Sequence, residues 1–137
     1  LDVSVQAQVL LLLDDLRKRR GLAFLFVSHD LSVVRWFCER VAVMYLGRIV
    51  EEGPVSRVLS APLHPYAAML RDAYPVPDPA LRADLPRIVG EIPSAAAPPP
   101  GCPFHPRCAH AMQVCSQQMP PLVQSADGAV ACHLHPG

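Results

Sequence analysis

Leu22-Ala-Phe-Leu-Phe-Val27, a short apolar run between Gly21 and Ser28, decides the predicted fold. A run of this length and composition favours a strand that is buried on both faces. The residues before Gly21 favour a helix, because apolar side chains recur at helical spacing and a basic run suits the helix C-terminus. The apolar stripe consists of Val5, Val9, Leu12 and Leu16. A helix followed directly by a buried strand predicts an α/β sheet.

Several further elements are expected after this strand. Residues 31–39 favour a second helix, and residues 41–45 and 48–51 flank Leu46-Gly47 as a predicted hairpin. Pro54 suits the start of another helix, with Val55, Val58 and Leu59 on its apolar face. A last short helix is expected over residues 64–71.

The proline content changes near residue 54, which indicates two regions of different structural character. All 16 prolines lie at or beyond Pro54, and the segments 74–79 and 95–100 are expected to be extended linkers.

The 12 Lys and Arg residues are balanced by 12 Asp and Glu residues, so the charge gives no support for nucleic-acid binding. No apolar run approaches the roughly 20 residues that cross a bilayer, and no secretory signal is visible.

The region from Gly101 onward holds four of the five cysteines and four of the six histidines of the 137-residue chain. The thiols have the spacing C-x5-C-x6-C-x16-C, without the close cysteine pairs that zinc sites usually show. Four thiolates can also hold an iron–sulfur cluster, and reduced thiols without metal are a third alternative. A zinc site of three cysteines and one histidine is chemically possible, although loop histidines are more common. The residues concerned are Cys102, Cys108, Cys115, Cys132, His105, His110, His133 and His135.

Three other positions have side chains that are often functional in proteins. His29 directly follows the predicted strand, at the edge where open α/β sheets bind their ligands. An imidazole there can bind a phosphate or polarise a water molecule, whereas the alternative is a loop or capping residue. Cys38 lies in an apolar stretch and is expected in the core, apart from the tail cysteines. His64-Pro65-Tyr66 marks a functional surface or, as we favour, only the start of a helix.

Three stretches together resemble the end of an ATP-binding cassette (ABC) ATPase. They are residues 1–10, the strand leading into Ser28-His29-Asp30, and residues 44–53. His64-Pro65-Tyr66 and the cysteine-rich tail narrow the resemblance to the dipeptide, oligopeptide and nickel importer subfamily. The resemblance implies an α/β fold in which residues 1–60 are the C-terminal part of a P-loop NTPase domain. Residues 61–137 are then a small, irregular, Pro- and Cys-rich extension.

The resemblance also implies roles for individual residues. Leu1 and Asp2 correspond to the end of the D-loop, which faces the nucleotide site of a partner ATPase, although Asp2 is also suited to cap a helix. His29 corresponds to the switch histidine, which contacts the γ-phosphate and orients the attacking water. The chain contains no Walker A loop, Walker B carboxylates or signature motif, and its only lysine is Lys18. The full-length protein is expected to carry these parts before Leu1 and to bind ATP and Mg²⁺, whereas this chain alone is expected to be inactive.

The implied function is to couple ATP hydrolysis to the uptake of dipeptides, oligopeptides or nickel. The expected partners are a second ATPase subunit in a homo- or heterodimer, transmembrane permease subunits and, indirectly, an extracytoplasmic solute-binding protein, but no nucleic acid. The expected location is peripheral, on the cytoplasmic face of the inner membrane, where stable disulfides are rare. Because the subfamily includes cluster-binding members, a [4Fe-4S] cluster on Cys102, Cys108, Cys115 and Cys132 is the leading hypothesis, and Zn²⁺ is the alternative.

Two rival functions belong to other classes. One is a non-catalytic metal-binding module, with iron–sulfur or zinc, that mediates an interaction or senses redox state. The other is a zinc-dependent nucleic-acid module, which the neutral charge disfavours.

Overall fold

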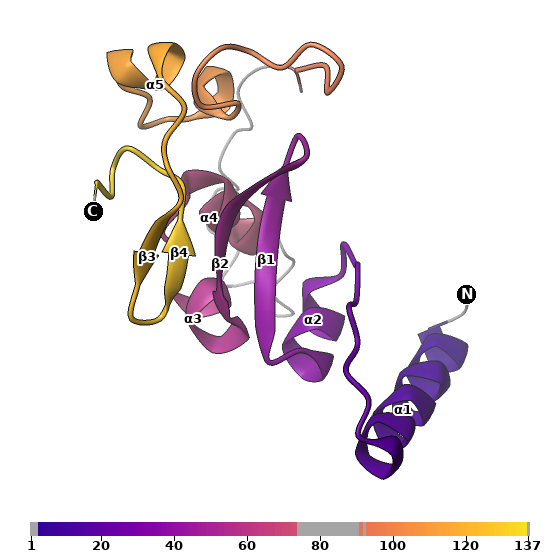
Figure 1. Cartoon of the computed structure of the whole chain (residues 1–137). Helices are drawn as coiled ribbons and strands as arrows, with labels where there is room; N and C mark the ends of the chain where they lie inside the picture. Colours follow the sequence, from indigo (N-terminus) through magenta and orange to yellow (C-terminus); the bar gives the residue numbers. More distant parts are fainter. Residues whose placement is uncertain (1–2, 74–90, 92, 137) are drawn as a thin grey trace, which may run out of the picture. The chain divides into compact units, whose positions relative to one another are not determined.

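The computed structural model describes residues 3–73, 91 and 93–136 (Figure 1). They divide into two units, one that ends at Cys38 and one that begins at Glu39. Within the described residues, no helix combines the length and the apolar character that a membrane span requires. The expected D-loop residues Leu1 and Asp2 and the expected linker 74–79 lie outside the described residues.

The first unit contains two helices. Helix α1 covers Val3–Arg20 and ends at Gly21, whose φ of 63° is the left-handed conformation that glycine adopts at low cost. Helix α2 covers Leu31–Phe37, and the side chain of Asp30 caps it by accepting two backbone N–H groups. The core consists of Leu10, Val33 and Phe37, with Leu13, Phe26 and Cys38 packed against it. The core position expected for Cys38 is confirmed.

Three expectations for this unit differ from the structure. Residues 22–27 form no strand, and the side chains of Leu25 and Val27 are 98% and 90% exposed. A strand needs neighbouring strands for its backbone N–H and C=O groups, and the described residues of this unit contain none. On α1 the buried side chain is Leu10, whereas Val5, Val9 and Leu12 of the expected stripe are exposed. Helix α2 also ends two residues earlier than expected.

The second unit begins with the expected hairpin. Strand β1 covers Arg40–Tyr45 and strand β2 covers Arg48–Pro54, and they pair antiparallel. Leu46 and Gly47 have φ angles of 45° and 77°, as a two-residue hairpin turn with two left-handed positions requires. Helix α3 covers Val55–Ser60 and helix α4 covers Pro65–Asp72. Pro54 precedes α3 as its N-cap residue and ends β2, so it is not the first helical residue that we expected.

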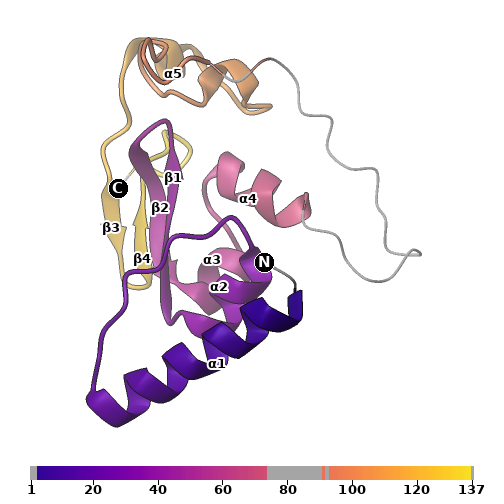
Figure 2. The same ribbon diagram turned by 90° about the vertical axis from the view of Figure 1, so that its right-hand side faces the viewer.

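The tail adds two strands to this hairpin. Strands β3, Val123–Ser125, and β4, Gly128–Val130, complete an antiparallel sheet of order β1-β2-β4-β3. The pairing of β4 with β2 places Val130 opposite Glu51. Figure 2 shows α3 and α4 on the same side of this sheet. The expected boundary between residues 60 and 61 stays a prediction, but strands from both sides of it share the sheet.

The rest of the tail is short turns and helices. It contains the 3-10 helix η2, His105–Arg107, and helix α5, Gln113–Gln117. Within the expected extended segment 95–100, the N–H of Ala97 donates to the carbonyl of Ser94 at 3.2 Å and closes a turn. The aromatic ring of Phe104 meets Tyr45 edge-on at 5.3 Å and Tyr66 at 5.4 Å, measured between ring centroids. Such pairs stabilise a fold by about 0.5–1.5 kcal/mol each, and these two attach the tail to β1 and α4.

Candidate functional site

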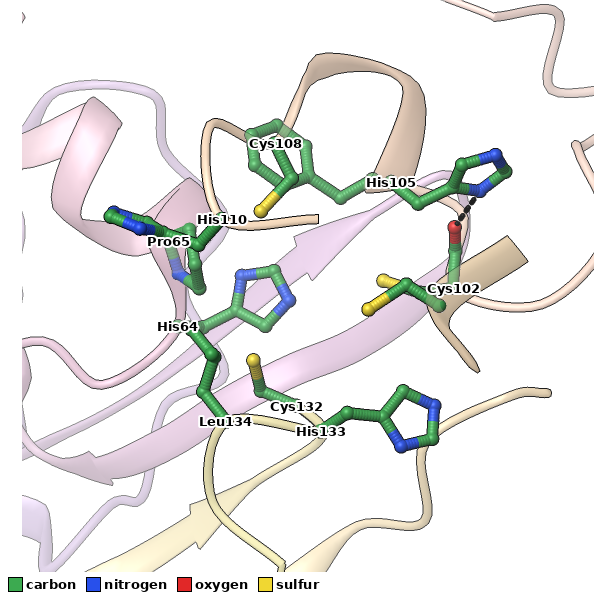
Figure 3. A pocket seen from close by; sticks show the side chains of 11 residues that line it. His64, Pro65, Cys102, His105, Cys108, His110, Cys132, His133 and Leu134 are labelled. Atoms are coloured by element: carbon green, nitrogen blue, oxygen red, sulfur yellow. Dashed lines mark hydrogen bonds between the residues drawn. The ribbon is translucent and has the colours of Figure 1, made fainter. Parts of the chain in front are cut away.

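One pocket in the second unit is lined by all four tail cysteines (Figure 3). They come from four places in the chain: before η2, directly after η2, from α5, and after β4. The N–H of Cys102 donates to the carbonyl of Cys115 at 2.7 Å, which joins two of these segments. The pairing of β4 with β2 brings Cys132 to the same place. The four thiols that we predicted to act together, Cys102, Cys108, Cys115 and Cys132, therefore lie around one pocket.

Backbone N–H groups favour the thiolate form of these cysteines. The N–H of Met112 donates to Cys115 Sγ at 3.4 Å. Backbone hydrogen bonding also lowers the pKa of the other three thiols, from Phe104 and His105 at Cys102, from His110 at Cys108, and from Leu134 at Cys132. Backbone N–H donors stabilise a thiolate more than a thiol. The local folds around the cysteines therefore suit the deprotonated form that a metal requires.

Burial has the opposite effect on the thiols. It is the main reason that the pKa values of Cys102, Cys108 and Cys132 are raised above their ordinary value. These three thiols are therefore neutral at pH 7 in the absence of a cation. A bound metal would supply the positive charge that compensates buried thiolates, and its binding would release protons.

The pocket does not match a site for a single metal ion. Throughout residues 3–73, 91 and 93–136, no three or more His, Cys, Asp or Glu side chains are grouped so that they could hold a metal ion. All five cysteines are free thiols. The cavity volume is about 10 Å³, which is the space for about one water molecule. The four thiols are of the type that binds a metal group, but in the present arrangement of the described side chains they are not placed to hold a metal ion.

His64 also lies in this pocket. It precedes Pro65, the first residue of α4, and its side chain is almost fully buried. Its Nδ1 accepts the N–H of Tyr66 at 3.0 Å, which places the proton of the neutral ring on Nε2. Figure 3 shows the ring pointing into the space between Cys102, Cys108 and Cys132. Burial, together with the nearby His135, lowers the pKa of His64 to about 4, so the ring is neutral at pH 7.

The tail histidines have other partners. His105 Nδ1 donates to the carbonyl of Cys102 at 2.9 Å, and His133 Nε2 donates to the carbonyl of Gln118 at 2.9 Å. His135 Nε2 donates to the carbonyl of Leu63 at 3.1 Å. His110 is exposed at the pocket rim. Three of these four rings therefore support the backbone, which is the loop role that we regarded as more common.

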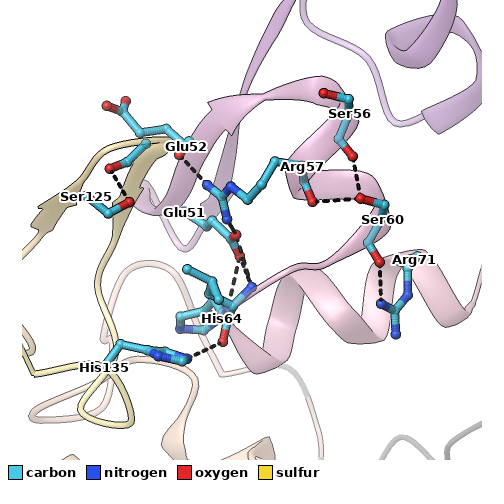
Figure 4. A network of polar contacts seen from close by, with 11 residues as sticks. Glu51, Glu52, Ser56, Arg57, Ser60, His64, Arg71, Ser125 and His135 are labelled. Carbon is cyan, nitrogen blue, oxygen red and sulfur yellow. Dashed lines mark hydrogen bonds and ion pairs between the residues drawn. The ribbon is translucent and has the colours of Figure 1, made fainter.

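A buried carboxylate holds the segment before α4 in place (Figure 4). Glu51 on β2 has no exposed side-chain surface, and it forms an ion pair with Arg57 of α3. Its oxygen atoms also accept the N–H groups of Leu63, at 3.0 Å, and His64, at 2.8 Å. Arg57 donates a further hydrogen bond to the carbonyl of Glu52 at 2.8 Å. This network connects β2, α3 and the start of α4, so it positions the backbone of His64.

The predicted phosphate-contacting histidine lies in the first unit. His29 is exposed in the loop before α2, and Asp30 behind it caps that helix. The N–H of Asp30 donates to Ser28 Oγ at 3.0 Å, which orders the loop around His29. His29 and Cys38 belong to the first unit, whereas the residues that line the cysteine pocket belong to the second.

Two residues of the site were missed by the sequence interpretation. His64 lies in a motif that we noticed, but Pro65 at a helix start was a sufficient explanation for it. Glu51 gave no signal, because a glutamate near the end of a hairpin strand is normally exposed. The hairpin of β3 and β4 was also missed, although Asp127 and Gly128 are typical turn residues and lie at the Ala126-Asp127 turn that joins these strands.

Comparisons with known proteins agree with the earlier resemblance. Residues 50–115 match the family described as "Oligopeptide/dipeptide transporter, C-terminal region". The chain is 55% identical over 136 residues to the "Probable peptide ABC transporter ATP-binding protein y4tS" of Sinorhizobium fredii, covering 98% of this chain and 38% of the relative. It is 46% identical over 135 residues to the "Dipeptide transport ATP-binding protein DppF" of Haemophilus influenzae, covering 98% and 41%. The chain thus spans about two fifths of the length of these relatives.

Proposed function

This chain belongs to the family of peptide ABC transporter ATP-binding proteins, and from that premise we propose that it is the C-terminal part of an importer ATPase subunit. The complete subunit would bind ATP and Mg²⁺ and couple hydrolysis to the uptake of dipeptides, oligopeptides or nickel. It would act peripherally on the cytoplasmic face of the inner membrane, with a second ATPase subunit, permease subunits and, indirectly, a solute-binding protein. The observation that carries this proposal is the match along 98% of the chain.

His29 is the proposed catalytic residue of this chain. Its exposed imidazole sits in a loop that Ser28 and the helix cap Asp30 hold in place, so it is accessible to a nucleotide. An imidazole at such a position can bind the γ-phosphate and orient the attacking water. Leu1 and Asp2 are proposed as D-loop residues. The chain has no Walker A loop, so it should not hydrolyse ATP alone.

The test uses the complete subunit with its partners. His29→Ala should lower the rate of ATP hydrolysis by about 100-fold or more while ATP affinity changes only a few-fold. Arg35→Ala, at an exposed position of α2, is the matched control and should keep the activity. A His29→Ala subunit that hydrolyses ATP at nearly the normal rate would contradict the assigned role.

We further propose that Cys102, Cys108, Cys115 and Cys132 hold a [4Fe-4S] cluster. Support comes from the four thiols around one pocket and from the backbone N–H groups beside them, such as that of Met112 at Cys115. The four side chains must move apart to admit it, because the present cavity has space for about one water molecule. A bound cluster would supply a cross-link between η2, α5 and β4 and an electron acceptor.

Metal analysis of the complete subunit, purified without oxygen, tests this second proposal. About four iron and four sulfide per chain are expected, and both should be lost when the four tail cysteines are changed to serine. Cys38→Ser is the matched control and should keep the cluster. One zinc per chain would instead establish the zinc alternative. A metal-free protein would contradict both the cluster proposal and the zinc alternative.

A non-catalytic, metal-dependent interaction or redox-sensing module is the second candidate function. It is favoured by the second unit, which contains the whole cysteine pocket and its own buried core. Unchanged ATP hydrolysis after His29→Ala, together with a bound metal, would support this candidate over the first.

A further inference from the structure

We propose that His64 donates a hydrogen bond from Nε2–H to a sulfur atom in the cysteine pocket and thereby sets the reduction potential of the cluster there. This inference rests on the proposed function, because it takes the [4Fe-4S] cluster as the occupant. His64 would be a positioning and tuning residue, since it holds no iron itself. Three observations lead to this role: the protonation of the ring, its surroundings, and the way that the fold holds it.

The hydrogen bond from Tyr66 determines which ring nitrogen carries the proton. A backbone N–H can only donate, so Nδ1 of His64 must accept with its lone pair at 3.0 Å. The neutral ring then carries its hydrogen on Nε2, the nitrogen that lies farther from the backbone. His64 therefore presents a donor to the pocket.

The surroundings of Nε2 offer few acceptors. The side chain of His64 is 1% exposed, and the described residues provide no hydrogen bond to Nε2. Phe104 covers one side of the ring at 5.7 Å between centroids, and Pro65 and Leu134 add apolar lining. The side-chain acceptors in this lining are the cysteine sulfurs and the imidazoles of His105, His110 and His133, and a bound cluster would add its sulfides.

The placement of the ring is imposed by the fold. Glu51 accepts the N–H of His64, and the same carboxylate is ion-paired with Arg57. The Tyr66 hydrogen bond then fixes the ring orientation at the start of α4. A donor held in this way needs no rearrangement when the charge in the pocket changes.

The physical effect on a cluster has a definite sign. Reduction adds negative charge, and hydrogen bonds to the sulfur atoms are among the factors that set cluster potentials. A donor stabilises the more negative, reduced form, so its removal should make the potential more negative. A tenfold change in the equilibrium constant of a one-electron couple corresponds to about 59 mV.

Two substitutions separate this role from the capping role of His64. His64→Asn keeps a side-chain oxygen that can accept the Tyr66 N–H, but it lacks the distant donor. His64→Gln carries an amide N–H₂ at about the reach of Nε2 and loses the short acceptor. In the complete subunit, we expect the potential of the Asn variant to fall by about 59 mV, a tenfold change. In the Gln variant, the equilibrium constant for reduction of the cluster should stay within a few-fold of its value in the unchanged protein.

The readouts are an electron paramagnetic resonance redox titration and nitrogen hyperfine spectra of the reduced cluster with ¹⁵N-labelled histidine. A weak ¹⁵N coupling is expected in the unchanged protein and should disappear in the Gln variant. Its absence from the unchanged protein would overturn the inference even if the Asn variant failed to fold. Equal shifts in both variants, or none in either, would also overturn it. Failure of the proposed function is recognised separately, because the unchanged subunit would then contain no iron or sulfide.

Discussion

The carboxylate of Glu51 accepts the backbone N–H of His64 at 2.8 Å, and both side chains are almost completely buried. Glu51 belongs to the central strand β2, and His64 faces the cysteine pocket. One hydrogen bond therefore connects the sheet to the candidate metal site. The geometry of the pocket depends on this strand as much as on the cysteines themselves.

The first prediction concerns this carboxylate. Glu51→Gln places an amide N–H₂ against backbone donors and leaves Arg57 without its charged partner, so it should lower the free energy of unfolding by about 3–5 kcal/mol. The measurement is urea unfolding of the metal-free chain, followed by tyrosine fluorescence. Glu52→Gln, at the neighbouring and partly exposed position, should cost less than about 1 kcal/mol. If the two variants lost equal unfolding free energy, the buried network around Glu51 would contribute no more to stability than an exposed glutamate.

The second prediction concerns pH. The pKa of His64 is about 4 in the folded chain and about 6.5 when unfolded, so the unfolded chain binds the proton more readily between these values. The free energy of unfolding should therefore fall as the pH falls from about 6.5 to 4, by up to about 3 kcal/mol.

Urea unfolding of the metal-free chain at a series of pH values measures this fall. The neighbouring thiols of Cys102, Cys108 and Cys132, whose pKa values are raised, stay neutral over the range. His64→Gln should flatten the profile, and a variant that keeps the full slope would assign it to other groups.

The third prediction concerns the backbone beside the pocket. Gly101 has a φ of 71°, and a Cβ there would lie 2.3 Å from the carbonyl oxygen of Cys115. Gly101→Ala should therefore break the hydrogen bond between Cys102 and Cys115 and reduce the metal content of the complete subunit at least several-fold. Gly47→Ala has a similar φ of 77° but meets no atom within 4 Å, so it should cost only about 1 kcal/mol of stability and keep the metal. Equal metal content in both proteins would contradict this argument.

The fourth prediction concerns the loop of His29. Asp30→Ala removes the acceptor of the Ser32 and Val33 N–H groups, so α2 should lose about 1 kcal/mol of stability. Urea unfolding monitored by Trp36 fluorescence reports on this unit, because Trp36 is the only tryptophan of the chain. Asp30→Asn retains a capping oxygen and should stay within about 0.5 kcal/mol of the unchanged protein. A similar loss in both variants would point to the charge of Asp30 instead of its cap.

Local features of the fold could be predicted from the sequence because they depend on neighbouring residues. The helix that ends at Gly21 and the hairpin around Leu46-Gly47 follow from periodicity and turn chemistry, and the structure confirms both. The strand expected over residues 22–27 was wrong, since a strand forms only where another strand supplies hydrogen bonds. The family could also be recognised, because it depends on motifs such as His64-Pro65-Tyr66.

By itself, the sequence determined which residues were able to act: four thiols in the tail, an imidazole after an apolar run, and turns with left-handed positions. Only the tertiary structure decided which of them meet. The four cysteines surround one pocket because β4 pairs with β2, and His64 joins them because buried Glu51 holds its backbone. These contacts join residues far apart in the chain, and their stability comes from burial that no local pattern encodes.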